Sequence, residues 1–290
     1  MANKPKLSVI GGDTRQIYAA DRLQKTGYDV TLTGFEYFDS VIKKAEDVPL
    51  DRALTAEILL LPLPFSKNGR TLNAPYSKNE IPLKALFDGV GERHKLFLGN
   101  ADQKTLSRFS ATGARVCDYF ADEPLTLYNA LLTAEGLLGL IIDKLPCAVF
   151  GSQAAVFGFG RIGFYLSRLL QAAGAEVTVF ARSDESRAKA RTLGLGAYDV
   201  QQPEKESFRF DYLINTIPAK TLKREALTHL NNGCFLFEAA SAPYGIDFDA
   251  AEDLGFSVYK AFSLPGKTAP KSAGCMIAET VHNKLTGVNI

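Results

Sequence analysis

Short apolar runs alternate along this chain with longer segments in which apolar residues recur at helical spacing. Such alternation predicts an α/β protein with parallel sheets. In the N-terminal part it predicts strands at residues 7–10, 29–33, 58–61, 95–98 and 114–117, and helices at 14–25, 83–87 and 103–110. Pro62, Pro64 and Pro75 frame an irregular polar stretch over residues 63–81. A loop of this length inside a compact domain is often functional, for example as a lid.

A second series of the same kind follows a long apolar helical pattern over residues 125–145. It predicts strands at 154–157, 176–180, 212–215, 234–238 and 257–261, and helices at 161–173 and 183–193. A last helical pattern covers 273–285, after a loop that carries Pro265, Gly266 and Pro270. The long helix before this series and the lone helix after it indicate a cofactor domain inserted into the first domain.

We therefore expect two Rossmann-like domains with parallel sheets and a cleft between them. Residues 1–124 and 271–290 would form an N-terminal substrate domain with a returning C-terminal helix. Residues 125–270, including the linking helix 125–145, would form an NADP-binding Rossmann domain.

A glycine pattern opens the second series. Gly158, Gly160 and Gly163, with Arg161 and Ile162 between the last two, match G-x-G-x-x-G between an apolar strand and an amphipathic helix. The first glycine would allow a tight turn, the second a close approach to a pyrophosphate, and the third a helix–strand contact. Free amides at the positive end of the helix would hold the phosphates. The alternative is a glycine turn that binds nothing.

The end of the next strand predicts NADP rather than NAD. Ala181, Arg182 and Ser183 follow Phe180, and no acidic residue stands among them. A carboxylate there would bond the ribose of NAD, whereas a guanidinium and a hydroxyl suit the 2′-phosphate of NADP. The alternative is that Arg182 is a solvated surface cation.

The N-terminal series of strands and helices lacks a comparable phosphate-binding pattern. Asp13 follows Gly11 and Gly12 at the predicted helix start, where its carboxylate would cap the free amides and exclude a phosphate. The N-terminal domain is therefore predicted to bind substrate rather than a second nucleotide.

Composition narrows the class further. The formal net charge of +1 gives no global field to attract nucleic acid or an anionic membrane. The N-terminus does not resemble a secretory signal, and the richest apolar stretch, residues 137–142, is much shorter than a membrane span. We expect a cytoplasmic protein. The four cysteines are widely spaced and distant in sequence from the three histidines, so we expect buried reduced thiols and no metal site.

Several blocks, in order along nearly the whole chain, resemble the family of dipicolinate synthase A subunits. They are residues 9–16 (VIGGDTRQ), 133–136 (TAEG), 151–153 (GSQ) leading into 158–163 (GFGRIG), 215–218 (NTIP) and 264–274 (LPGKTAPKSAG). The resemblance implies NADP-linked oxidation of a dihydrodipicolinate-type ring to dipicolinate by hydride transfer, during sporulation. It also implies that the partner is a flavoprotein-like B subunit, and that the fold is similar to that of the 2-hydroxyacid and alanine dehydrogenases. The family pattern has an arginine near position 242, where this chain has Ala242.

Arg15 and Lys271 are candidate substrate ligands, because a small dicarboxylate needs cations. Each lies in or just before the first turn of a predicted helix, where a cation opposes the helix dipole unless an anion is shared with the helix amides. The alternative is that both side chains extend into water. Thr133, on the long helix, could orient substrate, or could be an ordinary helix residue.

Further cofactor and substrate contacts are predicted by analogy at the carboxyl ends of two strands. Thr216 and Ile217 would line the nicotinamide ribose and Ser241 would lie near the ring, together with Asn215, Pro218 and Ala240. No histidine has a convincing catalytic position, so we expect aromatisation to drive hydride transfer without a strong base. Two alternatives remain: a dehydrogenase of another amino or keto acid, and an NADP-binding regulatory or scaffold subunit. We also expect a homo-oligomer.

Overall fold

The structure, a computed structural model, describes residues 4–40, 42–200 and 209–287. The chain divides into two compact units, residues 1–129 with 269–290 and residues 130–268. Each unit is built on a parallel six-stranded sheet covered by helices, so the predicted α/β fold is confirmed.

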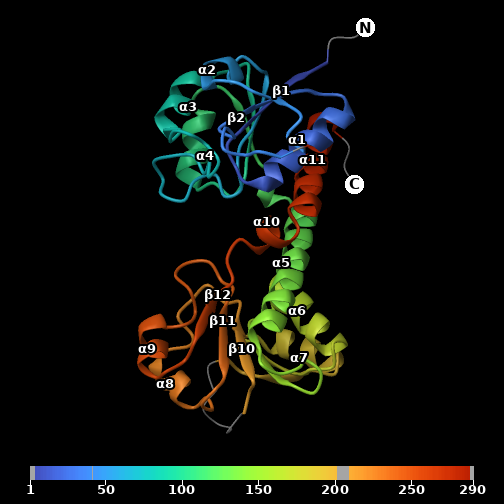
Figure 1. Cartoon of the computed structure of the whole chain (residues 1–290), viewed down its shortest axis with the longest axis vertical. Helices are drawn as coiled ribbons and strands as arrows, with labels where there is room; N and C mark the ends of the chain where they lie inside the picture. The colour runs from blue at the N-terminus through green and yellow to red at the C-terminus, as the bar shows by residue number, and fades with distance from the viewer. Residues whose placement is uncertain (1–3, 41, 201–208, 288–290) are drawn as a thin grey trace. The chain divides into compact units, whose positions relative to one another are not determined.

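The first unit has the strand order β3-β2-β1-β4-β5-β6. Its strands are β1 (Lys6–Ile10), β2 (Asp29–Thr33), β3 (Glu46–Asp47), β4 (Ile58–Leu60), β5 (Lys95–Leu98) and β6 (Arg115–Asp118). Its helices are α1 (Thr14–Thr26), α2 (Leu50–Ala53), α3 (Leu83–Gly89), α4 (Gln103–Ser110) and α11 (Pro270–Thr286), with a 3-10 turn at Tyr119–Ala121. Helices α1 and α11 cover one face of the sheet and α2, α3 and α4 the other (Figure 1).

Helices α1 and α11 run parallel. A Cβ at Gly274 would collide with the backbone of α1 at Arg15, so this glycine lets the two helices approach closely. Further along, Arg22 pairs with Glu279 at 3.1 Å, and the Tyr28 hydroxyl lies 3.1 Å from His282 Nδ1. Because the contacts advance in the same direction along both helices, their N-termini lie at the same end of the unit.

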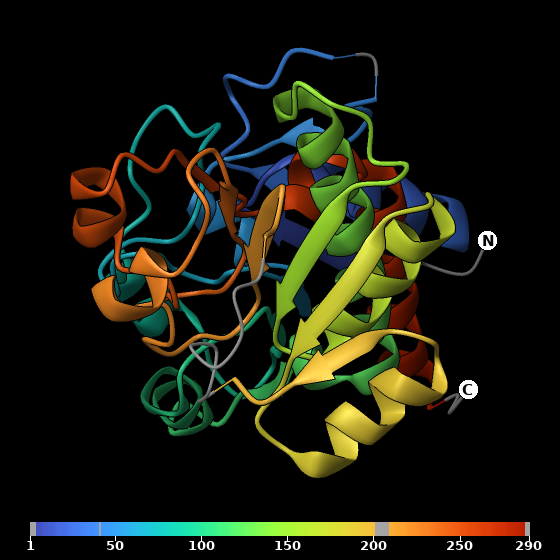
Figure 2. The same cartoon turned by 90° about the horizontal axis from the view of Figure 1, so that it is seen from below.

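The second unit has the order β12-β11-β10-β7-β8-β9. Its strands are β7 (Gln153–Phe157), β8 (Glu176–Phe180), β9 (Gly196–Tyr198), β10 (Tyr212–Asn215), β11 (Phe235–Glu238) and β12 (Val258–Lys260). Its shorter helices are α6 (Arg161–Ala172), α7 (Asp184–Thr192), α8 (Arg224–Thr228), α9 (Phe248–Asp253) and α10 (Leu264–Thr268). Figure 2 shows the yellow strands of this sheet side by side, with α6 and α7 following them in the chain. The order places β7 at the centre, where the connections diverge to both sides.

The long helix α5 (Glu123–Lys144) packs Leu137 and Ile141 into the core of the second unit. Over its whole length it is apolar enough to cross a membrane by length and composition alone, a test that the core helix of a globular protein also passes, whereas the prediction from the sequence concerned only its richest stretch, residues 137–142. Part of its apolar surface packs into the core of the second unit, as in the core helix of a globular protein.

The segment after β12 also differs from prediction. Residues 264–268 form helix α10 rather than a loop, because Leu264 and Pro265 are buried and the Thr268 hydroxyl bonds the Leu264 carbonyl at 2.9 Å. A Cβ at Gly136 would lie 2.9 Å from Leu264, so this glycine of α5 makes room for α10. Helix α11 begins at Pro270, three residues before the predicted start, because proline suits the first turn of a helix.

Candidate functional site

The glycine turn after β7 has the geometry that the sequence predicts. Gly158 has φ +99°, which an L side chain rarely adopts, and its amide bonds the Phe180 carbonyl at 2.8 Å. A Cβ at Gly163 would collide with the Gly158 carbonyl oxygen, so α6 packs directly on the turn. The first and third glycines are therefore required by the fold itself.

Gly160 differs from its neighbours. It is the N-cap residue of α6, and a Cβ built on it would meet no atom within 4 Å. Gly160 has no side chain, so no N-cap side chain caps the start of α6. Open space beside an uncapped N-terminus fits the pyrophosphate of a dinucleotide. Arg161 is exposed beside it, and Ile162 is half-buried.

The end of β8 places a cation at the surface. Arg182 is exposed, Ala181 is buried, and the Ala181 amide bonds the Tyr198 carbonyl at 3.0 Å. Ser183 caps α7, since its hydroxyl accepts from the Ser186 amide at 3.2 Å. The hydroxyl predicted to contact a phosphate is thus already engaged in helix capping.

The carboxyl ends of β7 and β10 lie together. Thr216 donates its hydroxyl to the Phe157 carbonyl at 2.8 Å, and a Cβ at Gly158 would collide with that hydroxyl and lie 3.0 Å from Ile217. The structure therefore brings Thr216 and Ile217 against the glycine turn, while Pro218 is exposed.

A buried carboxylate that the sequence did not single out organises the next loop. Glu238 is fully buried and accepts hydrogen bonds of 2.8–2.9 Å from the Asn215 side chain and from the amides of Ala240, Gly245 and Ile246. Asn215 is fully buried as well, so it supports the site rather than facing a ligand. Ser241 is exposed on the loop that this network holds, next to Ala240, which is buried.

The equivalent turn of the first unit is filled by the protein itself. The Gly12 amide bonds the Asn73 carbonyl at 2.8 Å, and a Cβ at Gly11 would lie 2.7 Å from Leu72. Asp13 caps α1 in a capping box with Gln16, as predicted. The irregular stretch between β4 and α3 thus packs on this turn and occupies the space that a pyrophosphate would need.

Arg15 does not extend into water. Its side chain is 5% exposed, pairs with Asp13 through Nε at 2.9 Å and Nη2 at 2.8 Å, and donates to the Leu63 carbonyl. The remaining nitrogen, Nη1, has no hydrogen-bond partner within the described part of the chain. The predicted alternative of a solvated side chain is therefore wrong for Arg15. Lys271, by contrast, is exposed in the first turn of α11.

The remaining candidates are divided between the two units. Thr133 is 7% exposed on α5 and lies in the second unit, as does Ser241, whereas Arg15 and Lys271 belong to the first. His94 is buried and bonds the Leu54 carbonyl at 2.9 Å, a packing role. Across residues 4–40, 42–200 and 209–287, no three His, Cys, Asp or Glu side chains gather as a metal site would need.

The thiols only partly match the prediction. All four are free, but only Cys234 is buried, whereas Cys117 and Cys275 are half-buried and Cys147 is exposed, so the expectation of four buried thiols is wrong. Burial raises the pKa of Cys234 to about 12, and it also raises the pKa of Cys117.

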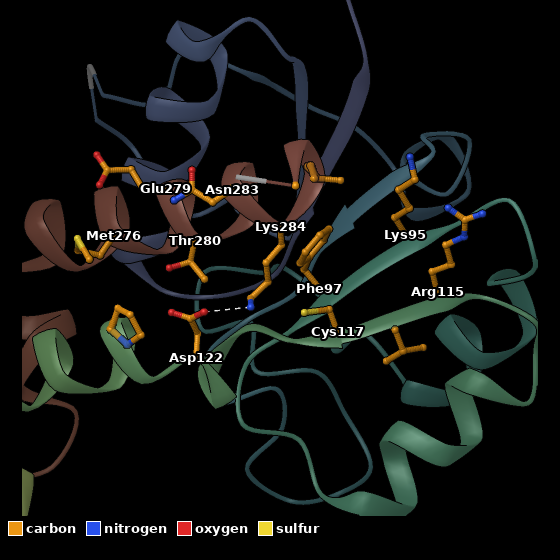
Figure 3. A pocket seen from close by; sticks show the side chains of 14 residues that line it. Lys95, Phe97, Arg115, Cys117, Asp122, Met276, Glu279, Thr280, Asn283 and Lys284 are labelled. Atoms are coloured by element: carbon orange, nitrogen blue, oxygen red, sulfur yellow. Dashed lines mark ion pairs between the residues drawn. The ribbon is translucent and has the colours of Figure 1, made fainter. Parts of the chain in front are cut away.

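Cys117 and Phe97 point into a cavity of about 900 Å³ in the first unit (Figure 3). Lys284 reaches over it to Asp122 at 3.0 Å, and Lys95 and Arg115 stand at its rim. None of the residues predicted to bind substrate or cofactor lines it.

Comparison with known proteins gives a consistent relationship. Residues 6–120 match the family of N-terminal domains of the dipicolinate synthase A subunit. The chain is 29% identical over 286 residues to the A subunit of dipicolinate synthase from Bacillus subtilis (strain 168), a match that covers 98% of this chain and 96% of that protein. The crystal structure of the corresponding A subunit from Bacillus halodurans superimposes with a TM-score of 0.87 at 26% identity, covering 98% and 99% of the two chains.

A more distant structure shows the fold alone. L-alanine dehydrogenase matches with a TM-score of 0.62 at 15% identity, over 96% of this chain and 88% of its own. The chain thus has a dehydrogenase-type fold. The resemblance to dipicolinate synthase A subunits that the motifs predict is confirmed over nearly the whole length.

Proposed function

We propose that this chain, which resembles dipicolinate synthase A subunits from end to end, is an NADP-dependent oxidoreductase that converts a dihydrodipicolinate-type ring dicarboxylate to dipicolinate during sporulation. The observation that carries the redox assignment is the open space beside Gly160 at the uncapped start of α6. A turn that served packing alone would not need this space, because only Gly158 and Gly163 are fixed by internal contacts.

The second unit would hold the cofactor. The first amides of α6 would bind the pyrophosphate, with Arg161 beside them. Arg182, exposed at the end of β8, would pair with the 2′-phosphate, and Thr216 and Ile217 would line the nicotinamide ribose. When bound, NADP supplies a hydride acceptor.

The first unit would supply substrate contacts. The N-termini of α1 and α11 lie at the same end of this unit, so their positive dipole ends add. Lys271 in the first turn of α11 would add a mobile cation for a carboxylate. Arg15 keeps only Nη1 for a ligand, because its other donors hold Asp13 and the Leu63 carbonyl. We therefore assign Arg15 mainly to positioning and Lys271 to binding.

No strong general base is assigned. Oxidation of a dihydro ring ends in an aromatic product, so loss of the ring proton to water is favourable once the hydride leaves. Thr133 and Ser241 would orient the ring through hydroxyl groups. His94 bonds the Leu54 carbonyl and His282 contacts the Tyr28 hydroxyl, so these two histidines are already engaged and are not assigned to catalysis.

We further propose that the chain has a flavoprotein-like B subunit for its partner, a cytoplasmic location and a homo-oligomeric state. Two other functions fit the same architecture: a dehydrogenase of another amino or keto acid, and NADP binding in a regulatory or scaffold subunit. The second is favoured by the absence of an acid–base pair among the assigned residues.

Cofactor titration tests the proposal. NADP and NAD affinities would be measured for the wild-type chain, for Arg182→Ala and for Arg168→Ala, an exposed arginine of α6 that bonds Gln171 and serves as control. Loss of one charge-assisted contact should weaken NADP roughly 10- to 100-fold in Arg182→Ala, with NAD little changed. An unchanged NADP preference would refute the assignment of Arg182.

A turnover assay distinguishes the proposed oxidoreductase from the two alternative functions. The chain would be incubated with NADP and candidate ring dicarboxylates or amino acids, and with NADPH and candidate keto acids, each with and without a second subunit, while the absorbance of reduced cofactor is followed. Reduction with the ring dicarboxylate supports the proposal. Tight NADP binding without turnover under any condition would instead identify a regulatory or scaffold subunit.

A further inference from the structure

Arg187, in the second turn of α7, turns its side chain back onto the end of β8. The side chain is 12% exposed, although α7 lies at the surface. Nη1 donates to the Ala181 carbonyl at 2.7 Å and to the Arg182 carbonyl at 2.7 Å. One guanidinium therefore fixes the two backbone units from which the Arg182 side chain emerges.

The same guanidinium faces two carboxylates. Nη2 pairs with Asp184, in the first turn of α7, and Nη1 lies 3.1 Å from Asp199 Oδ2. Asp199 directly follows β9, and the last residue of β9 pairs with Phe180 of the parallel strand β8. Asp199 and Arg182 therefore both lie at the carboxyl ends of these two neighbouring strands. Glu185, the other acidic residue in the first turn of α7, is exposed.

This arrangement has a consequence for an anionic ligand. Without Arg187, Asp184 and Asp199 would place negative charge beside the position proposed for the 2′-phosphate. A carboxylate near the end of this strand disfavours NADP. With Arg187 present, both carboxylates form ion pairs with its largely buried guanidinium.

We propose that Arg187 is a specificity-determining positioning residue for the 2′-phosphate of NADP. It holds the Ala181–Arg182 backbone so that Arg182 faces the phosphate, and it neutralises the carboxylates of Asp184 and Asp199. This inference rests on the proposed NADP binding and assigns to Arg187 a role separate from that of Arg182, which contacts the phosphate itself.

The test compares the affinities of NADP and NAD in Arg187→Ala, Arg187→Lys and Arg191→Ala, by quenching or enhancement of reduced-cofactor fluorescence. Arg191 is the matched control, because it lies one turn further along α7 and bonds the Ala197 carbonyl at 2.9 Å, away from Arg182. Arg187→Ala should lose about tenfold or more of its NADP affinity and much less of its NAD affinity. Arg187→Lys should recover part of the loss, and Arg191→Ala should keep the wild-type preference.

Two further readouts separate charge from packing. Removing both carboxylates in the combined variant Arg187→Ala, Asp184→Asn, Asp199→Asn should restore part of the NADP preference. Added salt should also reduce the loss of NADP affinity in Arg187→Ala. The repulsion between the 2′-phosphate and the two carboxylates, which this substitution uncovers, is screened over a Debye length of about 8 Å at physiological ionic strength. Thermal unfolding without cofactor reports any loss of fold in each variant.

The outcomes are distinct. If wild type binds neither cofactor, the proposed function itself fails. If wild type prefers NADP and Arg187→Ala weakens both cofactors equally, or lowers only the unfolding temperature, Arg187 is a structural residue and the inference is overturned. Should Arg187→Ala not fold, Arg187→Gln takes its place, because glutamine keeps a hydrogen-bond donor and removes the charge; an unaltered NADP preference in Arg187→Gln would overturn the inference as well.

Discussion

Gly160→Ala separates a ligand-binding role of the glycine turn from a packing role. Gly160 has φ −78° and ψ −160°, an extended conformation that alanine adopts without strain, and its added Cβ meets no atom within 4 Å. The folded protein should therefore lose only the N-cap preference of glycine over alanine, about 1 kcal/mol or less.

The same methyl group would enter the space proposed for the pyrophosphate. Forcing one extra carbon into a filled contact costs about 1–3 kcal/mol, which is roughly a 5- to 150-fold weaker affinity. At NADP concentrations near 100 times the wild-type Kd, ligand binding stabilises the wild type by about 2.7 kcal/mol. A variant with a 100-fold higher Kd would gain only about 0.4 kcal/mol at the same concentration.

Thermal unfolding with and without NADP measures both effects. Gly160→Ala should unfold near the wild-type temperature without cofactor and respond little to NADP. Gly163→Ala is the contrasting variant, because its Cβ would collide with the Gly158 carbonyl and should lower the unfolding temperature before any cofactor is added. A full NADP response in Gly160→Ala would refute the reasoning.

Three further predictions concern groups outside the turn. Glu238→Gln should cost roughly 3 kcal/mol of stability, seen by denaturant unfolding, because an amide donor would face amide donors; wild-type stability would contradict the network. Asp102 caps α4, and the Thr105 amide at 2.7 Å lowers its pKa, so Asp102→Ala should cost about 1 kcal/mol at neutral pH. This difference should fade as the pH falls below the ordinary value of 3.8 and through the lower folded pKa, and a pH-independent difference would count against it. Iodoacetamide followed by peptide mass spectrometry should modify exposed Cys147 well before buried Cys234, and the reverse order would show that the assigned burial is wrong.

The main elements were predictable because local signals and tertiary contacts agree. The predicted helix from residue 14 begins at Thr14, where Asp13 caps it, and the strand at 176–180 coincides with β8. The glycine pattern located the turn before α6 because its conformational demands are local. Short pieces such as β3 and β9 were missed, since two or three residues carry no usable periodicity.

Residues that act through tertiary contacts could not be found in this way. Arg187 lies several residues beyond the strand whose carbonyls it bonds, and nothing in the sequence indicates that its side chain folds back. In the sequence Glu238 is an ordinary strand end, and only the structure shows that amides of the loop from Ala240 to Ile246 donate hydrogen bonds to its carboxylate. Arg15 was predicted as a possible ligand from its position, but only the folded loop shows that Leu63 and Asp13 already hold it.

A crystal structure with bound NADP would show whether the glycine turn before α6 binds the cofactor. We expect the pyrophosphate on the first amides of α6, with its nearest approach at Gly160, and the 2′-phosphate beside Arg182. A dinucleotide bound elsewhere, or a glycine turn that stays free of phosphate at saturating NADP, would contradict this expectation.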